Sequence, residues 1–144
     1  MRGALLARVL TTGLVIAACG SQPGPVAPRL DRTIAVRATD QLRFEPNAIT
    51  VRSGETVAFA VTNVGKVDHE FVVGDAAVQR HHEEQMSHGA MSMDMGAHAA
   101  GVALPPGRTA TLTYTFHAPG TLMYGCHVDH HYEAGMEGTI HVIG

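Results

Sequence analysis

One cysteine, one histidine and one methionine occur at even spacing in the stretch YGCHVDHHYEAGMEG, residues 124–138. Cys126, His131 and Met136 lie five positions apart. A soft thiolate, two imidazoles and a weak axial thioether are the donors of a mononuclear copper site suited to electron transfer. The second imidazole must come from elsewhere, and the natural candidate is His69 in the upstream stretch NVGKVDHEFVVGD. Donor chemistry and spacing therefore predict one copper site from these four residues.

The same stretch holds two further histidines, His127 and His130, which one copper ion does not need. His127 directly follows the cysteine, and His130 adjoins His131, so neither spacing suits a second ligand from this loop. We expect both side chains to be exposed and not to bind the copper. Either could shape a surface for a protein partner or bind a second metal weakly.

A second concentration of metal-binding residues lies in DAAVQRHHEEQMSHGAMSMDMGAHAAG, residues 75–101. Thioethers favour Cu(I) and imidazoles suit Cu(II), so this segment could bind additional copper weakly. The alternative is a solvated loop of low complexity. Residues 76–86 could form a short helix, and we expect the rest to be a mobile insertion between two strands. Its candidate ligands are His81, His82, Met86, His88, Met91, Met93, Met95 and His98.

The elements that must position these ligands are short β-strands. From residue 33 onward apolar residues recur at every second position, as at Val57, Phe59 and Val61, and they alternate with threonine over 110–116. Turn signals separate these runs, among them SG at 53–54 and PPG at 105–107. Many short alternating segments with regular turns predict an antiparallel β-sandwich or barrel. A chain of 144 residues with 45% hydrophobic residues is sufficient for one domain with a packed core.

The amino-terminal segment has the pattern of an export signal. Arg2 and Arg8 precede an apolar run that is short for a membrane span, so residues 1–18 are interpreted as a signal peptide. The stretch IAAC, residues 16–19, resembles a bacterial lipobox. That resemblance implies cleavage before Cys19 and lipid attachment to its sulfur; the alternative is an ordinary signal peptide with a chance cysteine.

A lipidated Cys19 would anchor the mature chain stably in a membrane. Residues 19–32 contain GSQPGPVAPR, whose prolines, glycines and small polar residues predict a flexible tether. We therefore expect an exported, membrane-anchored lipoprotein on the extracytoplasmic side, in a periplasm or at the cell surface.

Charge and cysteine content narrow the function further. Loss of the two signal-peptide arginines leaves 8 basic and 13 acidic residues, a formal charge of −5, which argues against nucleic-acid binding. With Cys19 lipidated, Cys126 is the remaining thiol, and no internal disulfide can form. Metal ligation would explain why a free cysteine persists in an oxidising compartment.

Together these motifs resemble the cupredoxins, the blue copper proteins related to plastocyanin, pseudoazurin and azurin. The resemblance covers about residues 33–144 and includes an Asn-x-Gly motif before His69 and the pattern Cys-x4-His-x4-Met at 126–136. SGETVAFAVTN is similar to the strand before the first ligand, and APGTLMYGC to the strand that leads to the cysteine. The resemblance implies an all-β Greek-key sandwich with copper near one end, here with the His/Met-rich insertion at 75–101.

The chain departs from the family pattern at several positions. Asp129 and His130 stand where a Pro-Gly often precedes the loop histidine, and Glu70 stands where an asparagine often braces the cysteine loop. The fragment CHVDHHYEAGM also resembles the cysteine loop of multicopper oxidases, in which histidines on both sides of the cysteine serve a trinuclear cluster. Gly125 occupies one of those places here, so we expect no oxidase activity and no enzyme activity from this chain alone.

The sequence thus predicts a membrane-tethered protein that transfers single electrons through one type 1 copper ion. Cys126 would be the main ligand, His69 and His131 the imidazole ligands, and Met136 the axial ligand. The alternative is a protein that binds, buffers or delivers copper outside the cytoplasm and also uses the His/Met-rich segment. We expect a monomer whose partner is a redox protein or a copper donor or acceptor.

Overall fold

The computed structural model describes residues 29–87 and 100–144. Within these residues no helix is both long enough and apolar enough to cross a membrane. The predicted signal peptide and lipidated cysteine lie outside the described residues, as does most of the tether. The candidate copper ligands that also lie outside them are His88, Met91, Met93, Met95 and His98.

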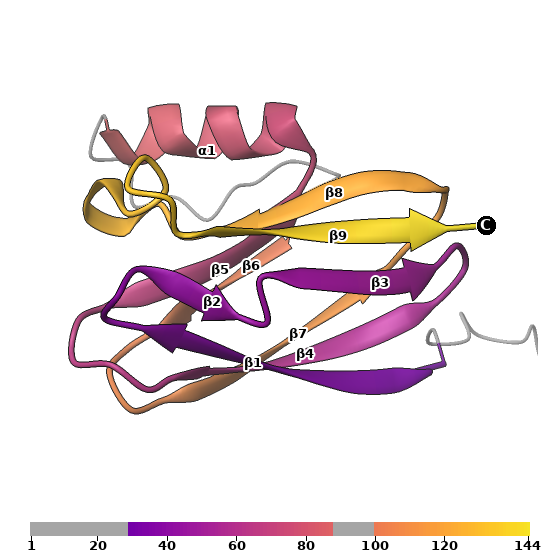
Figure 1. Cartoon of the computed structure of the whole chain (residues 1–144), viewed down its shortest axis with the longest axis horizontal. Helices are drawn as coiled ribbons and strands as arrows, with labels where there is room; N and C mark the ends of the chain where they lie inside the picture. Colours follow the sequence, from indigo (N-terminus) through magenta and orange to yellow (C-terminus); the bar gives the residue numbers. More distant parts are fainter. Residues whose placement is uncertain (1–28, 88–99) are drawn as a thin grey trace, which may run out of the picture.

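Two β-sheets packed face to face form the body of the protein (Figure 1). The described residues contain nine strands, and the four-stranded sheet has the order β2-β1-β4-β7. Its strands are β1 (Arg32–Thr39), β2 (Arg43–Glu45), β4 (Thr56–Asn63) and β7 (Thr109–Thr115).

The five-stranded sheet has the order β3-β9-β8-β5-β6 and carries the predicted ligands at one end. Its strands are β3 (Ala48–Arg52), β5 (His69–Gly74), β6 (Ala100–Leu104), β8 (Gly120–Gly125) and β9 (Glu137–Ile143). The predicted all-β Greek-key sandwich is confirmed. The expectation that all strand pairs are antiparallel is wrong for two pairs, because β1 runs parallel to β4 and β3 runs parallel to β9. Alternation in a sequence identifies the buried face of a strand but not the direction of its neighbour.

Alternating apolar residues of both sheets meet in a core with a central group of aromatic rings. Phe71 on β5 lies 5.4 Å from Phe44, 5.4 Å from Phe59 and 5.1 Å from Tyr124, measured between ring centroids. All four side chains are buried. Aromatic pairs of this kind contribute about 0.5–1.5 kcal/mol each beyond the burial of their surface. Because Phe71 lies two residues after His69, the same strand joins the core to the predicted site.

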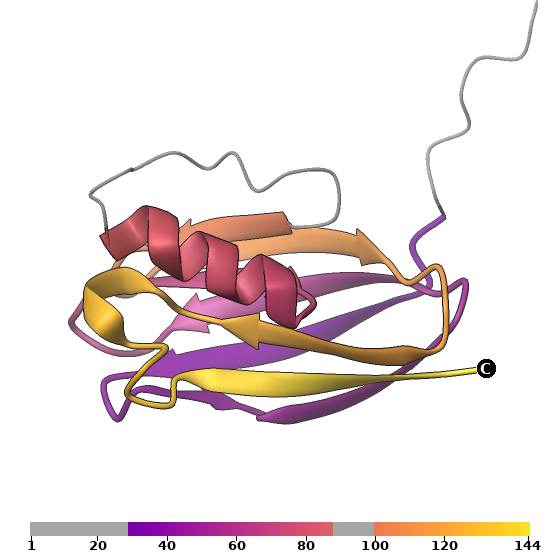
Figure 2. The same cartoon turned by 90° about the horizontal axis from the view of Figure 1, so that it is seen from above.

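Helix α1 (Ala76–Ser87) lies across the outer face of the five-stranded sheet, over β5 and β8 (Figures 1 and 2). The carboxylate of Asp75 accepts hydrogen bonds of 2.9 Å from the backbone N–H groups of Ala77 and Val78, which caps the helix amino terminus. The helix predicted at residues 76–86 is therefore confirmed and is one residue longer. β6 begins at Ala100, inside the range predicted for the insertion.

Tyr124 anchors the start of β9 directly after the predicted axial ligand. Its hydroxyl donates a hydrogen bond of 2.6 Å to the carbonyl of Pro46, and its ring covers Gly138. A Cβ atom added at Gly138 would overlap the ring atoms of Tyr124, so this position accepts only glycine without rearrangement. The contact holds β8 and β9 together where the loop between them begins and ends.

We predict that Gly138→Ala lowers the free energy of unfolding by about 1–3 kcal/mol, because overpacking displaces a buried aromatic ring. Chemical denaturation of the metal-free domain measures this change. Gly144→Ala is the matched control, since its added Cβ would meet only Pro119, at 3.9 Å. Equal unfolding midpoints for the two variants would contradict the assigned role of the Tyr124–Gly138 contact.

Candidate copper centre

Three predicted ligands from distant parts of the chain meet at one end of the sandwich. The ligand atoms of His69, Cys126 and His131 all lie within 4.8 Å of one another. The Cys126 sulfur is 3.7 Å from Nδ1 of His69 and 3.4 Å from Nδ1 of His131. Two metal bonds of about 2.0–2.3 Å, at trigonal or tetrahedral angles, separate their donor atoms by about 3.4–3.8 Å. The three donors are therefore spaced as they would be around one metal ion.

Adjacent strands place two of these ligands. His69 is the first residue of β5, and Cys126 directly follows β8. β5 and β8 are antiparallel neighbours whose ladder ends at the pair Val72 and Gly125. The two ligands thus leave the same end of one sheet, where the paired backbones limit their movement.

The loop between β8 and β9 folds back on itself to add the other two ligands. Cys126 N–H donates to the Met136 carbonyl at 3.1 Å, and Met136 N–H donates to the His131 carbonyl at 2.9 Å. Gly135 has a φ of 93°, a conformation that glycine adopts without steric cost. The backbone of Met136 is therefore hydrogen-bonded to the backbones of Cys126 and His131, and its side chain is buried.

The short 3-10 helix η1 (Val128–His130) forms the other part of this loop. Asp129 and His130 have φ values of 46° and 64°. The resemblance leads one to expect Pro-Gly at these two positions. A histidine therefore stands where glycine was expected, and it adopts a left-handed conformation. The hydrogen bond of 2.9 Å from His131 N–H to the Val128 carbonyl holds the turn closed.

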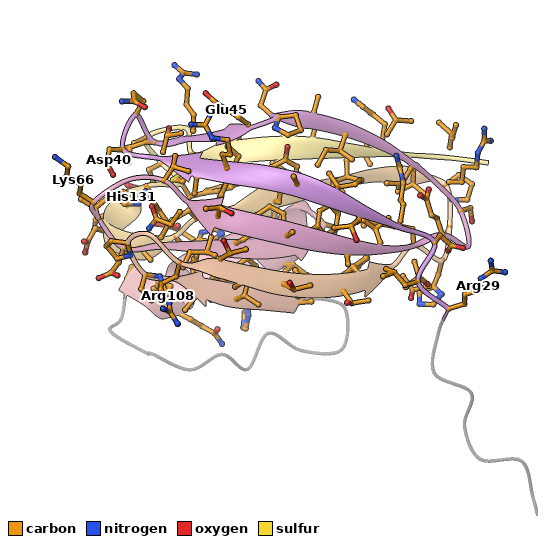
Figure 3. The ribbon with its side chains drawn as sticks, turned by 90° about the horizontal axis from the view of Figure 1, so that it is seen from below. Arg29, Asp40, Glu45, Lys66, Arg108 and His131 are labelled. Carbon is orange, nitrogen blue, oxygen red and sulfur yellow. The ribbon has the colours of Figure 1, made fainter. Side chains whose placement is uncertain are left out.

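The ligands differ in their access to solvent. His69, Cys126 and Met136 are buried, whereas His131 is half-buried. Figure 3 shows His131 at the same end of the sandwich as Asp40 and Lys66, with Arg29 at the opposite end. His131 is therefore the ligand through which the site approaches the surface.

Burial also controls the protonation of the donors. It raises the pKa of the Cys126 thiol to about 12, although the backbone N–H groups of Glu70 and Val128 oppose this shift. A metal that binds the thiolate must therefore displace a proton. Burial, and next the neighbouring His131, lower the pKa of His69, so that its imidazole is neutral and able to bind a metal at neutral pH.

The donor set fits copper. One thiolate, two imidazoles and a methionine at a closed site match the requirements of a mononuclear copper centre, and a buried thioether is a poor ligand for hard cations. Nε2 of His69 is buried and makes no hydrogen bond within the described residues, so packing orients this ring. Bound copper would supply a couple between Cu(I) and Cu(II), while the protein supplies the donor positions and excludes water.

The prediction that His127 is exposed is wrong, because its side chain is only 1% exposed. Its Nδ1 lies 2.6 Å from a carboxylate oxygen of Glu83, and its Nε2 lies 2.8 Å from the amide oxygen of Gln79. The ring also stacks on Tyr132, with centroids 4.5 Å apart. Helix α1 covers the loop at this point. The spacing of residues within the loop could not predict this contact, because the helix lies in a different part of the sequence. His130, by contrast, is exposed as predicted.

Glu70 stands at the position where the resemblance to cupredoxins leads one to expect a bracing asparagine. Its side chain is buried, and one carboxylate oxygen accepts the backbone N–H of His127 at 2.9 Å and lies 3.0 Å from Nε2 of His82. Burial raises the pKa of Glu70, but the hydrogen bond and charge of His82 and the contacts with His127 outweigh it, so that the pKa is below its usual value. The carboxylate therefore braces the cysteine loop through the backbone of His127.

His82 is consequently not an exposed member of the proposed secondary copper-binding set. It is 2% exposed, and its Nε2 is already engaged by Glu70. Of the other described candidates, His81 is exposed and Met86 is half-buried. The sequence reasoning missed Gln79 and Glu83, although positions 79, 82, 83 and 86 share one helix face by their spacing, which was the available signal.

The contacts of Glu70, His82 and His127 form a buried polar network. A second cluster of potential ligand atoms lies at the surface beside it. The donor atoms of Glu83, His130 and Glu133 all fall within 4.8 Å of one another. Nδ1 of His130 is 3.8 Å from Glu83 and 3.5 Å from Glu133. Glu83 also contacts buried His127, so this cluster shares a carboxylate with the network under the copper loop.

Comparison with known proteins agrees with this geometry. Residues 32–143 match the sequence profile of the copper binding proteins of the plastocyanin/azurin family. The copper-resistant cuproprotein CopI of Rubrivivax gelatinosus is 36% identical over 119 residues, which cover 83% of this chain and 70% of that protein. The protein of the same name from Pseudomonas aeruginosa is 35% identical over 143 residues, covering 81% and 78%.

The fold is also shared with a solved blue copper protein structure. Auracyanin B superposes with a TM-score of 0.71 at 25% identity, covering 83% of this chain and 94% of that one. The region that matches the family profile, residues 32–143, includes all four residues of the candidate copper site, His69, Cys126, His131 and Met136. The chain therefore belongs to the plastocyanin/azurin family of copper-binding proteins, and copper is its cofactor.

Proposed function

We propose that this protein acts in copper homeostasis outside the cytoplasm and that its copper centre exchanges single electrons with a partner. The observation that carries the proposal is the convergence of the His69, Cys126 and His131 donors, already spaced for one metal ion. A donor set that changes little between Cu(I) and Cu(II) allows electron exchange with little rearrangement.

The surrounding structure supports electron exchange in two ways. Strand pairing and the closed loop hold the donors in place, so little movement accompanies a change of charge. The thiol of Cys126 is buried, which shields it from oxidants, while half-buried His131 brings the site to the surface. The partner would therefore dock at the end of the sandwich that carries His131.

A role in copper handling is favoured by the names of the relatives, which are copper-resistant cuproproteins. The methionines and histidines of residues 88–99 would bind further copper weakly, together with exposed His81. In that role the protein would buffer copper or pass it to an acceptor protein. The two activities are compatible, because the segment and the cupredoxin site use different residues.

The proposed location follows from the amino-terminal sequence and is compatible with the fold. Cys19 would carry lipid, and residues 19–32 would tether the domain to the extracytoplasmic side of a membrane. Arg29, where the described structure begins, lies at the end of the sandwich opposite His131 (Figure 3). An anchor attached there would leave the copper end directed away from the membrane, free to meet a protein partner as a monomer.

The electron-transfer proposal predicts an intense thiolate-to-copper absorption band in the visible region when the soluble domain is loaded with Cu(II). Cys126→Ser should lose this band, because the sulfur is the donor of that transition. His141→Asn, which changes an exposed histidine on β9, is the control and should keep it. A wild-type protein without the band, or a Cys126→Ser variant that keeps it, would overturn this proposal.

The copper-handling proposal predicts more than one copper per chain for the wild type. Replacement of residues 88–99 by a glycine-serine linker of equal length should reduce the stoichiometry to one and lower the copper tolerance of cells that depend on the protein. The replacement spares α1, so the visible band should remain. Unchanged stoichiometry and tolerance would contradict copper handling by this segment without affecting the electron-transfer proposal.

A further inference from the structure

Helix α1 contacts the copper centre through the two residues that directly follow ligands in the sequence. Glu70 follows His69, and His127 follows Cys126. Both side chains are buried, and both contact residues of α1. One helix thus reaches the backbone beside two ligands that come from different strands.

The first contact joins α1 to β5. His82 Nε2 lies 3.0 Å from the same Glu70 oxygen that accepts the His127 backbone N–H at 2.9 Å. The backbone N–H of Glu70 in turn points at the Cys126 sulfur, 3.4 Å away. A single carboxylate therefore links the helix, the strand that carries His69 and the loop that carries Cys126.

The second contact joins α1 to the cysteine loop itself. The amide nitrogen of Gln79 donates to the carbonyls of Val72 at 3.1 Å and Met123 at 3.3 Å, so its oxygen faces Nε2 of His127. Glu83 contacts the other ring nitrogen at 2.6 Å. Both nitrogens of the His127 ring are therefore held by residues one helical turn apart on α1.

We propose that α1 is a positioning element of the copper centre, which fixes the backbone beside His69 and Cys126 through its contacts with Glu70 and His127. Groups that hold metal ligands in place strongly affect metal binding, and their removal typically weakens affinity by about 10–100-fold. This inference rests on the copper site alone and needs neither the proposed electron transfer nor the proposed copper handling.

The Glu70 carboxylate also places a negative charge in a buried position next to the ligand loop. A nearby negative charge stabilises Cu(II) relative to Cu(I), and it does so more strongly where water is excluded. Because both hydrogen bonds to the carboxylate use the same oxygen, Glu70→Gln can keep them and remove only the charge. Charge and positioning can therefore be separated by experiment.

The test compares His82→Leu, which removes the hydrogen bond, with His82→Gln, whose amide nitrogen can replace Nε2. Glu84→Gln, on the exposed side of the same helix, is the control. Copper dissociation constants are measured by chelator competition, together with the visible spectrum and the stability of the metal-free protein. We expect His82→Leu to weaken copper binding by about tenfold or more, His82→Gln to restore most of the affinity, and Glu84→Gln to match the wild type.

Glu70→Gln provides a second readout, which reports the effect of the charge separately from that of positioning. It should bind copper but favour Cu(I) by about tenfold, a rise in reduction potential of about 59 mV for a one-electron couple. The inference is overturned if folded His82→Leu has the affinity and spectrum of Glu84→Gln, or if it only lowers the stability of the metal-free protein. If His82→Leu does not fold, Glu83→Ala, which removes the contact with Nδ1 of His127, takes its place, and a copper affinity and spectrum equal to those of Glu84→Gln overturn the inference.

Discussion

The sulfur of Cys126 must lie close enough to two imidazole nitrogens for one metal ion to bind all three, and it must be shielded from water. The other features of this end of the molecule meet that requirement. The thiol is buried beside Nδ1 of His69 and Nδ1 of His131. In such surroundings the thiolate is stable only with a positive partner, because burial raises the pKa of Cys126 to about 12. Metal binding and loss of the thiol proton are consequently one event.

A rigid frame is needed because no single segment can supply all the donors. β5 and β8 bring His69 and Cys126 to the same end of one sheet, and Tyr124 packed on Gly138 holds the ends of the loop together. Within the loop, the backbone of Met136 is bonded to the residues of two other ligands. The site therefore depends on the sandwich for its position and on the loop for its closure.

Behind the ligands lies a buried polar network that a simple sandwich would not require. Glu70, His82 and His127 are all buried and hydrogen-bonded. Burying charged groups is costly unless they are paired, and such groups are a weak source of stability. Their arrangement is better explained by the precise placement of the neighbouring ligands. Helix α1, at the start of the His/Met-rich insertion, is thus in contact with the residues that flank two copper ligands.

The sequence by itself determined the loop ligands and the class of fold. Cys126, His131 and Met136 lie in one short loop, so their spacing limits where they can go, and period-two alternation identified strands with a buried face. Only the tertiary structure decided the parallel pairing of β1 with β4, the burial of His127 and the link between His82 and Glu70. These features depend on contacts between segments far apart in the chain. The local pattern of apolar residues predicts which side chains are buried, but it does not predict which segments bury them.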